Sequence, residues 1–145
     1  MSEREYPTRP WIGIGLLAFR GDDVLLVKRG KPPRMGEWSI PGGAQWVGET
    51  AEATARRELR EETGVEVGPL TLAAVVDALE QDDSGRTRFH YTIVDFAAEW
   101  ASGEPQAGDD VSDARWFGPP ELPGLGLWAE AIRVIEEARR RLRDV

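Results

Sequence analysis

The sequence predicts an α/β fold in a single domain. Apolar and β-branched segments recur along the chain, and two segments of helical character lie among and after them. A length of 145 residues is enough to bury a core but leaves no room for a second domain of ordinary size. We therefore expect one domain over residues 1–145, with the whole functional site inside it.

The first third of the chain is expected to form strands. Residues 11–20 and 24–27 are apolar runs on either side of Gly21-Asp22-Asp23, which is typical of a hairpin with a tight turn. A shorter strand is expected at residues 37–40. Pro41-Gly42-Gly43 should end it, because proline cannot continue a ladder and glycine frees the backbone, so a loop is expected to begin there.

Residues 50–63 are predicted to form a helix, because AEATARRELREE consists of good helix formers. Thr50 can cap the amino end with its hydroxyl, and Gly64 can end the helix in a left-handed conformation.

The second half is expected to form an antiparallel pair, a short strand and a closing helix. Residues 65–79 and 88–100 are rich in β-formers and flank the polar turn at 80–85. After a loop at 103–110, a short strand is expected at 114–117. The closing helix is amphipathic, because its apolar residues recur at helical spacing. They are Trp128, Ala131, Ile132, Ile135, Ala138 and Leu142.

Charge and composition exclude several classes of function. A formal net charge of −8 argues against stable nucleic-acid binding, which depends on clustered lysine and arginine. The absence of cysteine excludes disulfides, thiolate zinc sites and a cysteine nucleophile. Residues 1–10 lack the apolar core of a signal peptide, and the longest apolar run, at residues 11–19, is too short to cross a membrane as a helix. We expect a cytoplasmic protein that does not bind membranes.

The segment GAQWVGETAEATARRELREETGV at residues 43–65 resembles the Nudix box, G-x5-E-x7-R-E-U-x-E-E-x-G-U, where U is a bulky aliphatic residue. Every fixed position is filled, and a chance match is on the order of one in 10⁵ to 10⁶. The matching residues are Gly43, Glu49, Arg57, Glu58, Leu59, Glu61, Glu62, Gly64 and Val65. The resemblance implies a Nudix α/β/α sandwich with a central mixed β-sheet.

Physical chemistry supports a metal site in this segment. Glu58, Glu61 and Glu62 stand at i, i+3 and i+4, so their carboxylates project from one helix face and repel one another. A solvated acidic face is the ordinary explanation of such a cluster, but the full match to the box favours a bound cation. Oxygen ligands suit Mg²⁺ or Mn²⁺.

The resemblance also implies a role for each residue of the box. The carbonyl of Gly43 would be a metal ligand together with Glu58 and Glu62, with Glu61 close by. Arg57 and Glu49 would support the site, because an arginine can bind a carboxylate with two parallel hydrogen bonds and orient its neighbours.

Three further residues are candidates for substrate binding. Gly42 allows a close backbone approach to phosphates, and Arg29 can pair with a phosphate, although Arg29 and Arg34 are about as well explained as solvated loop charges. Trp46 lies among polar residues of the box loop and can stack on a nucleobase. Core packing is the default for the other tryptophans, Trp11, Trp38, Trp100, Trp116 and Trp128.

The general base is left open by the sequence. Glu61 is the first choice, and acids in loops are alternatives, because some relatives use one. These are Glu80, Asp109, Asp110 and Glu121. His90, the sole histidine, is better explained as a packed or surface residue of a strand. A Ser-His-Asp triad lacks the G-x-S-x-G motif that would support it.

The resemblance implies hydrolysis of a phosphoanhydride in a nucleoside diphosphate derivative. The segments HYTIVDF and GDDVSDARWFGPPEL are similar to ADP-ribose pyrophosphatase members of the family, so ADP-ribose or a similar sugar nucleotide is the expected substrate. Two alternatives remain: a nucleoside triphosphate pyrophosphohydrolase, and a nucleotide-sensing module without catalysis. Homodimers are common in the family, so a homodimer is an expectation to test.

Overall fold

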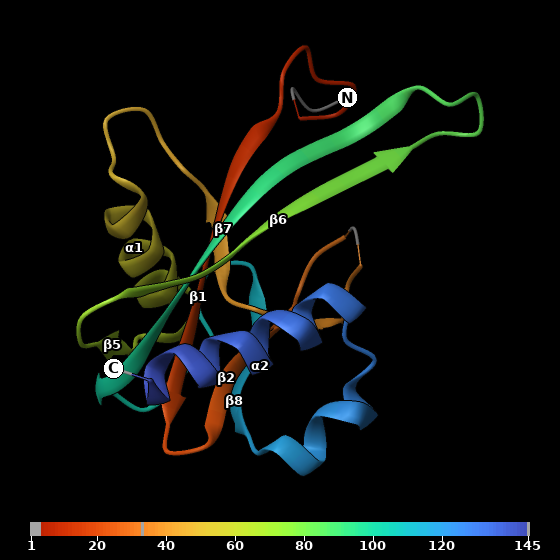
Figure 1. Cartoon of the computed structure of the whole chain (residues 1–145). Helices are drawn as coiled ribbons and strands as arrows, with labels where there is room; N and C mark the ends of the chain where they lie inside the picture. The colour runs from red at the N-terminus through yellow and green to blue at the C-terminus, as the bar shows by residue number, and fades with distance from the viewer. Residues whose placement is uncertain (1–3, 33, 145) are drawn as a thin grey trace.

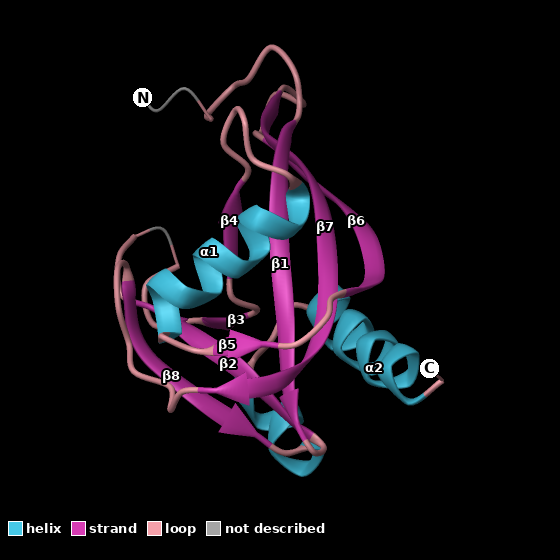
Figure 2. Cartoon of the chain, turned by 90° about the vertical axis from the view of Figure 1, so that its left-hand side faces the viewer, coloured by secondary structure: helices cyan, strands magenta, loops and turns pink. Residues whose placement is uncertain are grey.

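The fold is a mixed β-sheet between two α-helices (Figures 1 and 2). The computed structural model describes residues 4–32 and 34–144. Helix α1 (Ala51–Thr63) and helix α2 (Ala129–Arg143) pack on opposite faces of the sheet, each over its own apolar cluster. Eight strands lie in the described residues: β1 (Trp11–Arg20), β2 (Asp23–Arg29), β3 (Trp38–Ser39), β4 (Gly42–Ala44), β5 (Glu66–Val67), β6 (Thr71–Gln81), β7 (Thr87–Ser102) and β8 (Val111–Phe117). The predicted α/β/α architecture is confirmed.

Strand β1 is the centre of the sheet. It pairs in parallel with β7 and in antiparallel fashion with β2 and β4, so the sheet is mixed. Its side chains are buried on both faces. Leu16 packs in the cluster beneath α1, and Leu17, the next residue, packs in the cluster beneath α2. A strand covered on both faces explains why this segment of the sequence is almost continuously apolar.

The predicted loop at Gly42-Gly43 is wrong, because these residues begin strand β4, which pairs with Gly13, Ile14 and Gly15 of β1. Glycine makes this pairing feasible at close range. A Cβ placed on Gly42 would lie 2.1 Å from the carbonyl oxygen of Ile14. The consequence is that the start of the box is held rigidly against the central strand.

Helix α1 begins and ends where the sequence predicts. The Thr50 hydroxyl accepts a hydrogen bond from the backbone N–H of Ala53 at 3.1 Å. Gly64 ends the helix with φ +74°, and its N–H donates to the carbonyl of Arg60. Ala55 and Leu59 are buried against the sheet, which fixes the rotation of the helix and leaves the box carboxylates on its flank.

The segment predicted as one β-region at 65–79 is two strands. Strand β5 stops at Val67, and Gly68-Pro69-Leu70 separates it from β6. Strand β6 pairs with β7 as predicted, but it continues through Glu80 and Gln81, which the sequence placed in the turn. The hairpin therefore projects farther than expected, as Figure 1 shows.

The last third of the chain contains β8, a short 3₁₀ helix (Pro119–Leu125) and α2. Strand β8 begins three residues earlier than predicted. On α2, Ala131, Ile135 and Ala138 are buried as expected, but Ile132 is 38% exposed and Trp128, at the amino end, is 52% exposed. Within the described part of the chain, no helix is both long and apolar enough to span a membrane.

Candidate active site

Arg57 and Glu49 form a clamp between helix α1 and the loop before it. The guanidinium donates through Nε to Glu49 Oε2 at 2.6 Å and through Nη2 to Glu49 Oε1 at 3.0 Å. These two parallel bonds lower the pKa of Glu49 to about 2, with the hydrogen bond from Arg57 as the main cause. Arg57 and Glu49 therefore make the two-bond contact, and their supporting role in the site stays a prediction.

The same arginine orients two carboxylates of the box. Its Nη1 donates to Glu58 Oε1 at 2.8 Å and to Glu61 Oε2 at 3.3 Å. The side chains of Arg57 and Glu58 are each only 13% exposed, so the contact between them lies largely out of water, where charge-assisted hydrogen bonds are strong.

Glu58 lies directly against the backbone of Gly43. A Cβ on Gly43 would stand 2.5 Å from the carboxyl carbon and from Oε1 of Glu58. Only glycine can occupy this position without moving the carboxylate. Burial raises the pKa of Glu58, although its hydrogen bond with Arg57 opposes that shift.

Glu62 faces Gly42 one turn farther along the helix. The N–H of Gly42 donates to Glu62 Oε1 at 2.9 Å. Burial raises the pKa of Glu62 to about 8, and the negative charge of Glu58 contributes. Glu58 and Glu62 therefore lie side by side against the backbone of Gly42 and Gly43, called the glycine bend below. Both carboxyl groups are poorly solvated, which disfavours their charged forms.

Glu61 points more toward solvent, with a side chain 41% exposed. In residues 4–32 and 34–144, no group of three acidic or imidazole side chains is close enough to hold a metal ion as it stands. The three carboxylates share a flank of the helix, but Glu58 and Glu62 are the pair that meets the glycine bend.

These features fit a hard divalent cation. Two desolvated carboxylates converge on a backbone segment that a Cβ would obstruct, and a cation there would relieve the burden that burial places on both anions. The metal-ligand roles of Gly43, Glu58, Glu61 and Glu62 nevertheless stay predictions.

The loop at 103–110 brings one further acid to this site. Its backbone is bonded to the end of helix α1, with Gln106 N donating to Thr63 O and Gly108 N to Glu62 O. The next residue, Asp109, has a φ of +54°, and its charge raises the pKa of both Glu58 and Glu62. Asp109 therefore lies close to the two buried carboxylates.

The three other candidate acids have different partners, and two of them do not lie in loops, since Glu80 belongs to β6 and Glu121 to the 3₁₀ helix. Glu80 pairs with Arg34 at 3.8 Å, Asp110 pairs with Lys31 at 2.7 Å, and Glu121 accepts a hydrogen bond from the N–H of Gly118. The sequence named Asp109 only as one of four, since nothing in the local pattern shows which loop folds back on the helix.

Arg29 and Trp46 each lie near a charged side chain of the box. The charge of Arg29, at the end of β2, lowers the pKa of Glu62, which places it near that side chain. The ring of Trp46 covers the guanidinium carbon of Arg57, 3.5 Å from the ring centroid, and the residue is 57% exposed. Their substrate-binding roles stay predictions, as does that of Gly42.

The other tryptophans are packed or peripheral. Trp38 contacts Phe117 edge-on at 4.9 Å between ring centroids, and Trp100 and Trp116 lie on either side of Arg20. His90 lies in β7 opposite Leu79, in the projecting hairpin.

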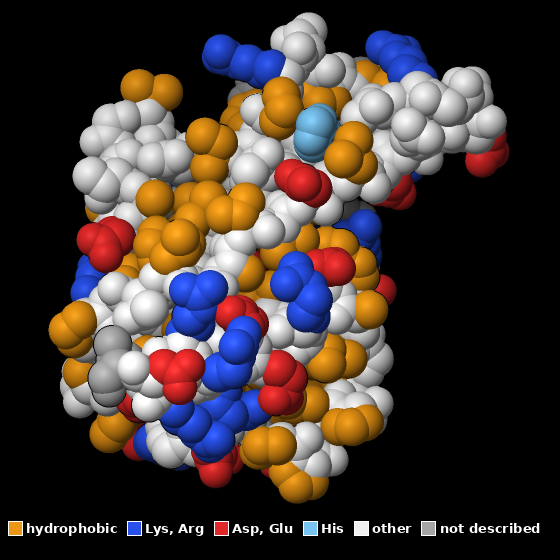
Figure 3. Space-filling model, viewed as in Figure 1, with side chains coloured by type: hydrophobic (Ala, Val, Ile, Leu, Met, Phe, Trp, Pro, Cys, Tyr) orange, Lys and Arg blue, Asp and Glu red, His pale blue; other side chains and the backbone are white. Residues whose placement is uncertain are grey.

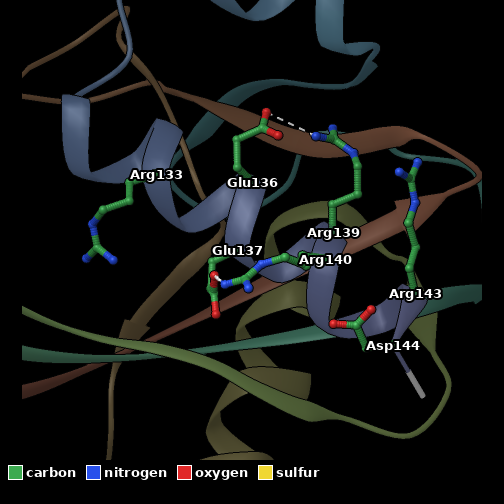
Figure 4. A pocket seen from close by; sticks show the side chains of 7 residues that line it. All are labelled: Arg133, Glu136, Glu137, Arg139, Arg140, Arg143 and Asp144. Atoms are coloured by element: carbon green, nitrogen blue, oxygen red, sulfur yellow. Dashed lines mark hydrogen bonds and ion pairs between the residues drawn. The ribbon is translucent and has the colours of Figure 1, made fainter.

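A hollow lies along α2, away from the box, with a volume of about 530 Å³ (Figure 4). Its arginines have acidic partners: Arg139 contacts Glu136 at 3.1 Å, and Arg140 contacts Glu137. Such i,i+3 pairs are typical of a solvated helix surface, and they leave the hollow with little unbalanced charge to hold a ligand.

Known proteins show the same fold and sequence pattern. A NUDIX domain model matches residues 9–138. An ADP-ribose pyrophosphatase of Methanocaldococcus jannaschii is 32% identical over 123 residues, 85% of this chain and 70% of that protein. A Mycobacterium tuberculosis protein assigned as 8-oxo-dGTP diphosphatase 2 is 40% identical, covering 79% of this chain and 77% of its own length.

Longer relatives and solved structures show similarity to the same family. The chain spans 41% of an NAD-capped RNA hydrolase of Stutzerimonas stutzeri, with 36% identity. The NUDIX domain of Shewanella oneidensis NrtR, solved as a complex with ADP ribose, is 27% identical with a TM-score of 0.78 and covers 93% of this chain and 90% of that one. With the box geometry and these matches together, the chain belongs to the Nudix hydrolase family of pyrophosphatases, which generally uses a divalent metal.

Proposed function

We propose that this protein hydrolyses, with Mg²⁺ or Mn²⁺, the phosphoanhydride bond of a nucleoside diphosphate linked to another group, with ADP-ribose or a similar sugar nucleotide as substrate. The observation that carries the proposal is the meeting of Glu58 and Glu62 with the Gly42–Gly43 backbone. Support for the substrate class comes from the M. jannaschii relative and from the NrtR domain bound to ADP ribose.

Glu58, Glu62 and the Gly43 carbonyl would hold the ion, which supplies charge neutralisation for the phosphates and a more acidic water. Arg57 keeps Glu58 and Glu61 in place through its hydrogen bonds. Arg29, close to Glu62, is well placed to pair with a phosphate oxygen.

Either of two acids would accept the proton of the attacking water. Glu61 is accessible to solvent and oriented by Arg57, whereas Asp109 lies next to the buried pair on a loop tied to the helix. Comparing Glu61→Gln with Asp109→Asn separates them: the base variant should lose kcat by about a hundredfold or more while KM changes little.

A second function remains a candidate because of a specific likeness. The M. tuberculosis protein assigned as 8-oxo-dGTP diphosphatase 2 is 40% identical over 117 residues, so hydrolysis of a nucleoside triphosphate is the alternative. A nucleotide-sensing role without catalysis is less favoured, because every glutamate of the box is retained.

The test is a hydrolysis screen with Mg²⁺ and with Mn²⁺ over ADP-ribose, other sugar nucleotides, dinucleoside polyphosphates, and normal and oxidised triphosphates. We expect the highest kcat/KM with a sugar nucleotide, and loss of activity in Glu58→Gln. Preference for an oxidised triphosphate would support the alternative, and no turnover of any nucleotide with either metal would support the sensing role.

A further inference from the structure

We propose that a groove beside the box loop binds the nucleobase of the substrate, an inference that rests on the proposed function. The groove has a volume of about 670 Å³ and lies between the segment leading into β1 and the loop leading into α1. Residues 7–12 form one wall and residues 45–49 form the other.

Trp46 provides the platform for a planar group. Arg57 stacks on its ring at 3.5 Å from the centroid, and the residue stays 57% exposed while lining the groove. Because Arg57 also bonds to Glu58 and Glu61, the ring is separated from the carboxylates by one side chain. A substrate that lies across Arg57 can therefore have phosphates at the box and its base on Trp46.

The groove is held in shape before any ligand binds. Gln45 N–H donates to the carbonyl of Ile12 at 3.1 Å, which joins the two walls. Gln45 Nε2 donates to Glu49 O at 2.7 Å, and Trp46 N–H donates to Glu49 Oε1 at 3.1 Å, so the loop that carries the tryptophan is fixed by its own hydrogen bonds. A preformed site loses less entropy when it binds a ligand.

Arg9 gives the groove an available positive charge. Across residues 4–32 and 34–144 it forms no ion pair, hydrogen bond or ring contact, unlike the arginines of the α2 hollow in Figure 4. In a protein of net charge −8, an unpaired arginine that lines the same groove as an exposed aromatic ring favours a ligand that is both planar and anionic. A nucleotide has both properties.

Trp128 is the rival platform, since it is 52% exposed, but it lies at the amino end of α2 and does not line this groove. It provides a matched control. The two tryptophans differ in position but hardly in exposure, so alanine substitutions at both can be compared directly.

Calorimetric titration with AMP, without divalent metal and with EDTA present, tests the platform. We expect AMP to bind and ribose 5-phosphate, which has no base, to bind at least about tenfold more weakly. Trp46→Ala should weaken AMP binding about tenfold, Trp46→Phe should retain most of it, and Trp128→Ala should match the wild type. Thermal melting of each variant checks that it is folded.

Arg9→Ala tests the charge, with Arg115→Ala as control because Arg115 is exposed and pairs with Asp113 at 2.8 Å. We expect Arg9→Ala to weaken AMP binding severalfold, because it removes a positive charge that attracts the anion to the groove, and to leave the binding of uncharged adenosine nearly unchanged. Arg115→Ala should affect neither ligand.

Several results would overturn the inference: no detectable AMP binding, equal AMP affinity in wild type and Trp46→Ala, or loss of binding in Trp128→Ala instead. A folded protein that hydrolyses sugar nucleotides but gives one of these results has the proposed function and a different base site. Base binding at Trp46 without hydrolysis would instead leave the groove in place and refute the catalytic proposal.

Discussion

The two helices that cover the sheet differ in how their charged side chains are paired. On α2, arginines and glutamates pair with one another along the surface, for example Arg133 with Glu130 at 2.6 Å, and charges of both signs alternate over this helix in Figure 3. On α1, Glu58 and Glu62 lie together, partly buried, against the backbone of Gly42 and Gly43, and their pKa values are raised. Charge is locally balanced on one face and left unbalanced on the other.

The two charge patterns suit different roles, a stable surface on α2 and a binding site on α1. Paired surface charges contribute little, but they do not oppose folding. Two partly buried carboxylates that lie close together oppose folding unless a cation compensates them, and such clusters are found most often at functional sites. We infer that the α1 side was shaped for a ligand and the α2 side for packing and hydration.

The largest effect on the α1 side is expected from Gly43→Ala. The added Cβ would stand 2.5 Å from the Glu58 carboxylate and displace it. Glu58 is a proposed metal ligand, and a small displacement of such a ligand lowers activity strongly. We therefore expect kcat/KM to fall about a hundredfold, with the fold retained. Steady-state kinetics and circular dichroism check this. Gly124→Ala is the control, because a Cβ there meets nothing within 4 Å, and activity equal to wild type in Gly43→Ala would refute the role of the bend.

Asp95 sharpens the comparison, because it is a buried acid on the α2 side. A Cβ on Gly15 would lie 2.0 Å from Asp95 Oδ1, so the carboxyl fills space that glycine leaves open, and burial raises its pKa to about 6. The folded state therefore holds this proton more tightly than the unfolded state. As pH rises from about 4 through about 6, the Asp95 contribution to stability falls by about 2 to 3 kcal/mol.

Asp95→Asn removes this titration. Denaturant unfolding between pH 4 and pH 7 should show the variant gaining on the wild type as pH rises, by about 2 to 3 kcal/mol over the range. Parallel pH profiles would mean that Asp95 is better solvated than its 4% exposure suggests.

A smaller effect is expected from Arg57→Lys. Lysine keeps the charge but cannot form the two parallel bonds to Glu49 at 2.6 and 3.0 Å or bridge to Glu58. We expect kcat/KM to fall about tenfold with a lower Tm. Arg60→Lys is the matched control. Arg60 pairs with the exposed side chain of Glu66, so this substitution should leave kcat/KM unchanged. A similar fall of kcat/KM in both variants would show that the two bonds between Arg57 and Glu49 have no particular role in the site.

The smallest effect is expected from Glu137→Gln on α2. Its carboxylate accepts hydrogen bonds from Arg140 and Arg141, and these bonds lower its pKa. Because the group is near water, we expect Tm to change by no more than about 2 °C and hydrolysis to remain as in wild type. A loss of activity comparable to that of a box variant would break the division between the two faces.

The sequence predicted the features that depend on neighbouring residues and missed those that depend on contacts between residues far apart in the chain. Helix α1, its Thr50 cap and its Gly64 end follow from neighbouring residues, and so does the placement of the glutamates on one flank. Strand β4 was missed, because glycine and proline ordinarily mark loops and only close contact with β1 makes Gly42 a strand residue. Local patterns contain no such contact.

The site shows the same limit. The clamp between Arg57 and Glu49 was implied by the resemblance to the box, whereas the approach of Asp109 depends on a loop that bonds to the end of α1 at Gly108. Helical spacing alone placed Glu58, Glu61 and Glu62 on one face without ranking them, whereas packing of Leu59 against the sheet leaves Glu61 the most exposed of the three.

Direct titration of the protein with Mg²⁺ and Mn²⁺ tests most directly whether the buried carboxylates hold a cation. Calorimetry on the wild type, on Glu58→Gln with Glu62→Gln, and on Glu136→Gln with Glu137→Gln should show divalent binding in the first and third proteins and at least about a hundredfold weaker binding in the second. Equal affinity in all three proteins, or no binding to the wild type, would contradict the account.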